Sequence, residues 1–152
     1  MTKPSPGPKS DWRRRWGGRL LVMEAGALLA VAVLALRLLP FRHVARLLIG
    51  RAGPADMPLP HNAAPPASAV PWQVARAVGR ASDLLPFPTL CLVQAIAARS
   101  MLARRGHATI LHLSLQMGTP AGPAAHAWLT LAGVPVIGIG APPGQVEIAR
   151  FT

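Results

Sequence analysis

The sequence predicts an α+β protein in which N-terminal helices, and a helix that carries the single cysteine Cys91, pack on a small antiparallel sheet. Before Gly106, most apolar residues recur at the three-to-four-residue spacing of helices. After Gly106, the glycine expected just past a helix end, apolar and polar residues alternate with the period of two that strands require. Short turns separate the alternating stretches, which is typical of antiparallel strands.

The N-terminal third predicts a basic lead, two helices and a linker. Residues 1–18 are rich in proline and arginine and predict a disordered lead. Residues 19–39 are strongly apolar and predict a helix, which ends because Pro40 lacks a backbone donor. Residues 41–50 carry apolar side chains at helical spacing and arginines on the other side, so they predict a short amphipathic helix, and residues 19–51 form a helical segment. Residues 52–70 are rich in proline and alanine and predict a linker.

Residues 71–152 predict a single core. It begins with helices at about 71–85 and 90–105, and Thr89 is the expected N-cap of the second, which places Cys91 at its second helical position. Strands are predicted at 109–117, 125–132 and 134–139. Because the strands follow one another with short connections, we expect an antiparallel meander of at least three strands.

The composition excludes several classes of function. The 152 residues are enough for one domain, and they include one cysteine and only five acidic residues against 16 lysines and arginines, a net charge of +11. Scarce acids argue against paired-carboxylate and two-metal chemistry. One cysteine and separate histidines argue against a metal site. We therefore expect no metal and no cofactor, and a lone thiol fits the reducing cytoplasm.

The positive charge is concentrated around the apolar segment 19–39. Residues 1–51 carry ten lysines and arginines against two acids. This pattern predicts that the protein binds an anionic membrane surface or an acidic partner. The sequence has no basic stripe interleaved with aromatic residues, which is the pattern expected for nucleic-acid binding. Segment 19–39 could be a helix packed on the protein, a membrane span or a cleaved signal. We expect a packed helix, because Glu24 lies inside the apolar run, and a cytoplasmic protein for which residues 19–39 are the candidate membrane-associated segment.

Cys91 and His126 are the candidate catalytic pair. The positive end of a helix dipole favours the thiolate, which is the reactive form of a cysteine at a helix start. His126 follows 35 residues later on a predicted strand. A thiol at a helix start with an imidazole base on a packed strand is the arrangement of papain and the transglutaminases. The alternative is a buried apolar cysteine and a structural strand histidine.

The residues around this pair resemble the C-terminal peptidase half of lasso-peptide biosynthesis B proteins, which belong to the transglutaminase-like superfamily. The resemblance runs from about Arg19 to Phe151. It rests chiefly on Cys91-Leu92, Arg104-Arg105-Gly106, the strand with Leu111 and Leu113, and Ala125-His126-Ala127-Trp128 with Gly133.

This resemblance implies a leader peptidase with a transglutaminase/papain-like fold. Such an enzyme cuts a ribosomally made precursor peptide, and a separate ATP-dependent cyclase then closes a macrolactam on the freed amine. Cys91 would be the nucleophile and His126 the base. Because residues 1–70 show no strand pattern for a fused recognition domain, a separate leader-recognition protein is also expected.

One position departs from the family's pattern. The family places an aspartate about twelve residues after the histidine, where this chain has Gly138. In triad enzymes, loss of the orienting acid can lower kcat by about 10⁴. Gln145 and Glu147 are the remaining candidates for an orienting group.

Two further residues could line the site. His112 lies on the polar face of its predicted strand, and Trp128 points the same way as His126, two residues away. Two alternatives to the peptidase also stay open. One is a weak or inactive adaptor of the same fold, and the other is a small membrane-anchored protein whose cysteine and histidine are structural.

Overall fold

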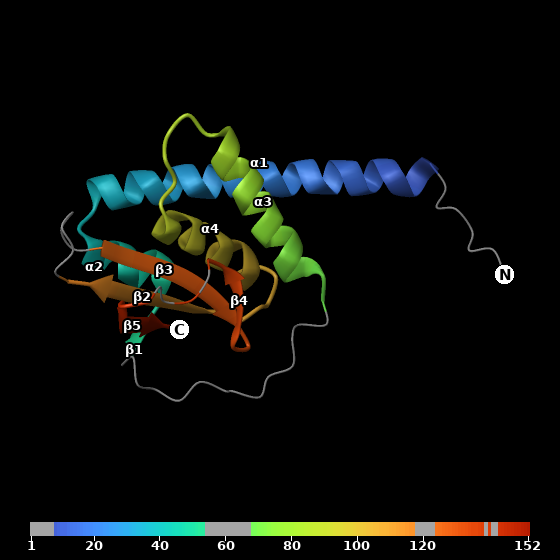
Figure 1. Ribbon diagram of the computed structural model, residues 1–152. Coiled ribbons are helices and arrows are strands. Elements are labelled where there is room, and N and C mark those ends of the chain that lie inside the picture. The colour runs from blue at the N-terminus through green and yellow to red at the C-terminus, as the bar shows by residue number, and fades with distance from the viewer. Residues whose placement is uncertain (1–7, 54–67, 118–123, 139, 141–142) are drawn as a thin grey trace.

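The computed structural model describes residues 8–53, 68–117, 124–138, 140 and 143–152. A long helix, α1, lies across α3 and α4, and α4 in turn packs on the sheet (Figure 1). The helical elements are α1 (Pro8–Leu38), α2 (Phe41–Val44), the π-helical turn η1 (Ala45–Ile49), α3 (Val70–Leu84) and α4 (Cys91–Ala103). The strands are β1 (Ala52–Gly53), β2 (Ile110–Gln116), β3 (Ala124–Leu131), β4 (Val134–Ile137) and β5 (Val146–Phe151).

The N-terminal helix is longer than the sequence predicts. It begins at Pro8, so residues 8–18, expected in a disordered lead, are helical. Residues 1–7 of that lead, and residues 54–67 of the expected linker, lie outside the described residues. The first two residues of the expected linker form β1, which pairs with β5.

The apolar helix α1 packs on the protein, as expected for segment 19–39. Ala25, Leu29 and Ala32 are buried in the core against α3 and α4. Glu24, the acid inside the apolar run, is 2.6 Å from Arg105 at the end of α4. The hydrogen bond from Arg105 lowers the pKa of Glu24 despite partial burial. By length and composition alone, the stretch Gly17–Leu38 of this helix could also cross a membrane.

Five antiparallel strands form one sheet in the order β1-β5-β2-β3-β4. The meander β2-β3-β4 confirms the prediction, and Gly106, with a φ of 78°, ends the α4 region as expected. One face of the sheet is apolar and packs on α4 through Leu111, Leu129, Leu131 and Phe151. The other face carries the polar side chains of β2, β3 and β5, and we call it the polar face.

Strand β5 is not predicted from the sequence, because a bulge disturbs its alternation. Leu113 pairs with Ala149 and Ser114 pairs with Glu147, so Ile148 is an extra residue between them. Without the bulge, Glu147 would share a face with Ala149 and point into the apolar core. The bulge therefore brings Glu147 to the polar face.

Candidate active site

Cys91 is the first residue of α4, one position earlier in the helix than predicted. The N-cap is Leu90, and no side chain caps this helix end, so the prediction that Thr89 is the N-cap is wrong. The Thr89 hydroxyl bonds to the Ser82 hydroxyl of α3 instead. The thiol of Cys91 is free and half-buried at a helix end whose first backbone N–H groups no side chain occupies.

Gln94 fixes the segment that leads into this helix end. Its side-chain amide donates to the Thr89 carbonyl at 3.0 Å and to the Ser82 hydroxyl at 3.1 Å. The end of α3, the 85–90 segment and the first turn of α4 are therefore tied together beside Cys91. The same 85–90 segment, with Ser82, lines an open, shallow pocket of about 590 Å³.

His126 belongs to a ladder of three stacked rings on the polar face. Its ring lies 5.9 Å from that of Trp128, with 19° between the planes. Trp128 in turn stacks on His112 at 4.9 Å and 5°. The register explains the order, because His112 is directly opposite Trp128 in the β2–β3 pair. We call His126, Trp128 and His112 the ring ladder.

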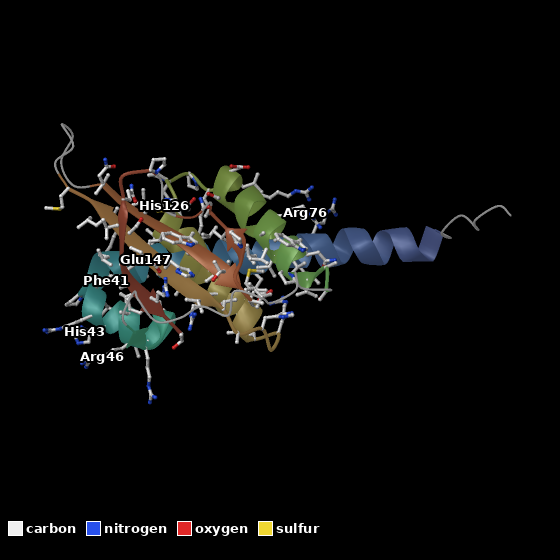
Figure 2. The ribbon with its side chains drawn as sticks, turned by 60° about the horizontal axis from the view of Figure 1, so that its bottom comes forward. Phe41, His43, Arg46, Arg76, His126 and Glu147 are labelled. Carbon is white, nitrogen blue, oxygen red and sulfur yellow. The ribbon has the colours of Figure 1, made fainter. Side chains whose placement is uncertain are left out.

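Glu147 binds the inner end of the ring ladder (Figure 2). Its Oε1 lies 2.6 Å from His112 Nδ1, and the other ring nitrogen, Nε2, lies 2.8 Å from the Thr130 hydroxyl. His112 is 1% exposed, and both of its nitrogens are engaged. His112 is thus a buried, fixed member of the site. The other histidine of the ring ladder, His126, lies near the start of β3.

Arg150 completes this cluster by donating to Glu147 from Nε at 2.7 Å. Burial works to raise the pKa of Glu147. The hydrogen bonds and charges of Arg150 and His112 outweigh burial, so the pKa lies below its ordinary value of 4.5. Glu147 is therefore ionised at neutral pH and holds two basic side chains together on the polar face.

Gln145 also reaches the polar face. Its Oε1 accepts a hydrogen bond of 2.6 Å from the Ser114 hydroxyl. Ser114 lies opposite His126 on one side and opposite Glu147 on the other. Both candidate orienting residues, Gln145 and Glu147, are thus brought to the face that carries His126, and their described partners are Ser114, His112 and Arg150.

Gly138, where the resemblance places an aspartate, adopts a backbone conformation that disfavours a side chain. Its φ of 73° lies in the left-handed region, and an added Cβ would lie 3.0 Å from Trp128 Cβ and 3.2 Å from the Ala127 carbonyl oxygen. A residue with a Cβ would therefore be strained here and would require β3 to shift by a few tenths of an ångström.

We expect both Gly138→Ala and Gly138→Asp to destabilise the protein by about 1–3 kcal/mol, because each places a Cβ in a left-handed conformation against β3. Urea unfolding of the two variants measures this loss. A folded Gly138→Asp that cleaves substrate faster than the wild type would show instead that the site lacks only an acid.

The candidate pair belongs to one end of the molecule. α4 packs on β3, and the two elements run in the same direction (Figure 1). The start of α4, with Cys91, and the start of β3, with His126, therefore lie at the same end. His126 leaves β3 from the polar face, whereas α4 packs on the opposite face. Contact between the Cys91 thiol and the His126 imidazole stays a prediction. If it forms, it would lie around the start of β3.

No cluster of potential metal ligands accompanies this pair where the structure is described. In those ranges, no three His, Cys, Asp or Glu residues gather as metal ligands. What the geometry offers is a helix-initial thiol and a strand histidine supported by an aromatic and charged ladder. Thiol enzymes built on a helix and an antiparallel sheet use the same two residue types, a helix-start thiol and a strand imidazole.

The comparison with protein families agrees with this class. The model of the transglutaminase-like superfamily matches residues 35–150, and the chain belongs to that superfamily. The superfamily includes cysteine peptidases. No curated protein and no solved structure matches the chain significantly.

Proposed function

We propose that this protein is a cysteine peptidase that removes the leader from a ribosomally made precursor peptide during lasso-peptide maturation. The observation that carries the proposal is the free, half-buried Cys91 at the first residue of α4, within a domain of a superfamily that includes cysteine peptidases. The resemblance of the Cys91 and His126 surroundings to lasso-peptide B proteins supplies the substrate class.

In this mechanism the His126 imidazole accepts the thiol proton, and the Cys91 sulfur attacks the scissile carbonyl carbon. The uncapped N–H groups of the first turn of α4 can donate to the resulting oxyanion. The imidazolium then gives its proton to the leaving amine, which departs as the new N-terminus of the core peptide. Water hydrolyses the thioester, releasing the leader with a free carboxylate and restoring the thiol.

The ring ladder supplies the orientation that an aspartate gives in other triads. Stacking on Trp128 restricts the plane of the His126 ring, and Trp128 is itself held by His112. His112 is fixed by Glu147 and Thr130. The orientation of His126 therefore depends on stacking with Trp128, which stacks on His112, and His112 is held by the ionised Glu147 carboxylate.

The proposal includes two protein partners. A separate leader-recognition protein presents the precursor, and an ATP-dependent macrolactam cyclase uses the amine that cleavage frees. The pocket beside residues 85–90 is the candidate position for precursor side chains next to the scissile bond, because it adjoins the start of α4 and is lined by Leu85, Pro86, Phe87 and Pro88.

Dibromoacetone tests the pairing on which the mechanism depends. It alkylates a thiol and then bridges to an imidazole only when its three-carbon unit can span the two groups. We expect one intramolecular bridge between Cys91 and His126, identified by peptide mass spectrometry. Cys91→Ser should remove both alkylation and bridge, and His126→Gln should leave alkylation without the bridge. A wild-type protein that is alkylated and never bridged would contradict the peptidase mechanism.

Gly138 favours a second candidate function, an adaptor of the same fold without catalysis. The chain has no acid at this position, and the left-handed φ of Gly138 and its close approach to β3 disfavour one. An adaptor would bind the precursor and the cyclase equally well with Cys91→Ala. Precursor that stays intact with the wild-type protein, the recognition partner and the cyclase all present would establish this second function.

A further inference from the structure

Helix α1 is apolar on two opposite faces, and the described part of the chain covers only one of them. The inner face holds the buried Ala25, Leu29 and Ala32. The outer face holds large apolar side chains that recur every three to eight residues and are 52–70% exposed. They are Leu20, Met23, Val31, Leu34 and Leu38. We call these five residues the outer stripe.

The outer stripe is unusual for a surface in contact with water. Only 17% of the most apolar window of α1 is buried. A helix that is apolar all round normally lies in a core or in lipid, and a continuous exposed apolar face marks an interaction site. Beyond α1, Phe41 of α2 and Leu47 of η1 are further exposed apolar side chains, at 44% and 74%.

The charges beside the outer stripe identify its partner as an anionic surface. Arg37, Arg42 and Arg46 are exposed where α1 gives way to α2 and η1, and Figure 2 shows Phe41, His43 and Arg46 extending outward from this corner. A pocket of about 980 Å³ there is lined by three arginines, Arg42, Arg46 and Arg51. Glu24 does not oppose an anion, because it is engaged by Arg104 and Arg105.

The packing of α1 excludes a membrane-spanning orientation for the folded protein. To span a bilayer, α1 would have to withdraw Ala25, Leu29 and Ala32 from α3 and α4 and break the Glu24–Arg105 ion pair. α3 cannot follow it into lipid, because its exposed face carries Arg80 and Arg76, the second of which is labelled in Figure 2. A helix that keeps one face on the protein can give only the other face to a membrane.

We propose that the protein binds anionic membranes with α1 lying in the plane of the bilayer. The outer stripe enters the interface between headgroups and acyl chains, and the arginine-lined pocket faces the lipid phosphates. The protein stays folded, and α1 keeps its contacts with α3 and α4. Precursor cleavage would then take place at a membrane surface.

Flotation with vesicles tests this proposal on the full chain. We expect binding to vesicles of phosphatidylcholine mixed with phosphatidylglycerol to exceed binding to phosphatidylcholine alone by about tenfold or more. Met23→Glu should reduce binding at least about tenfold. Met117→Glu is the matched control, because Met117 is equally exposed, at 71% against 70%, and lies just after β2, outside α1. It should bind like the wild type.

Two further experiments test the role of the arginines and the orientation of α1 in the membrane. Arg42→Gln with Arg46→Gln should remove most of the preference for anionic vesicles, and an unchanged preference would overturn the headgroup assignment. Alkaline carbonate should release the bound protein, whereas retention would show a spanning helix. A dimer that Met23→Glu converts to a monomer, or no vesicle binding by the wild type, would show that another surface covers the stripe. These readouts do not depend on peptidase activity.

Discussion

Cys91→Ala is expected to lower precursor cleavage by at least about 10⁴-fold, because it removes the atom that forms the thioester. His126→Ala should cause a loss of similar size, and the double variant should be little worse than either single one, since the two groups act as a unit. The measurement is mass spectrometry of a lasso precursor peptide incubated with the protein and a leader-recognition partner. Thermal unfolding should show both variants folded, because Cys91 and His126 are only half-buried.

Two controls make this result specific. Cys91→Ser keeps nearly the same volume and should be as inactive as Cys91→Ala, which excludes a packing effect. Met117→Glu changes an exposed residue just after the end of β2 and should cleave normally. Partial activity in Cys91→Ala would place the nucleophile elsewhere and refute the assignment of this cysteine.

Glu147→Ala is expected to destabilise the protein by about 2–3 kcal/mol at neutral pH, because it leaves two largely buried basic groups without their carboxylate. The His112 side chain is 2% exposed and the Arg150 Nε lies 2.7 Å from the lost oxygen. Glu147→Gln should lose less, since its amide oxygen can still accept from a ring nitrogen. Urea unfolding of the three proteins gives these differences.

The pH dependence has a definite sign. The pKa of Glu147 is lowered in the folded protein, so its stabilisation is fully present above the ordinary value of 4.5 and is lost as the pH falls through the lower, folded value. Glu147→Gln should therefore unfold with a weaker dependence on pH in this acidic range. Equal acid sensitivity of both proteins would mean that Glu147 does not hold the cluster.

Activity measurements on the same Glu147 variants separate a role in positioning His126 from a role in the stability of the fold. If the ring ladder orients His126, Glu147→Gln should lower kcat at a temperature where the protein is fully folded, with little change in KM. A merely structural role would change the unfolding midpoint and leave kcat unaltered. Glu147 is a positioning residue in this scheme, since it acts on His126 through His112 and Trp128.

Local patterns were sufficient to predict most elements near the site. The alternation in β2 and β3 reflects side chains that face either α4 or the polar face, so it can be read directly from the sequence. The glycine after α4 is a second such local signal. The pairing of His112 with Glu147 joins residues 35 positions apart and depends on the bulge at Ile148. No local pattern encodes that bulge, so neither β5 nor the partner of Glu147 could be predicted.

The same limit applies at the start of α4. Thr89 is a good N-cap by residue type, but its hydroxyl is taken by Ser82 from α3, a contact that depends on how two helices cross. The sequence shows glycine at position 138, but only the structure shows its left-handed φ and its close approach to β3, which together disfavour a side chain there.

The boundary of the family match has a practical consequence for α1. The match begins at residue 35, so a shortened protein cut to that boundary would lose Ala25, Leu29 and Ala32. The apolar sides of α3 and α4 that these residues cover would then face water, and the trimmed domain is expected to aggregate. Although most of α1 lies outside the matched region, it covers apolar surface of the transglutaminase-like domain and keeps that surface from water.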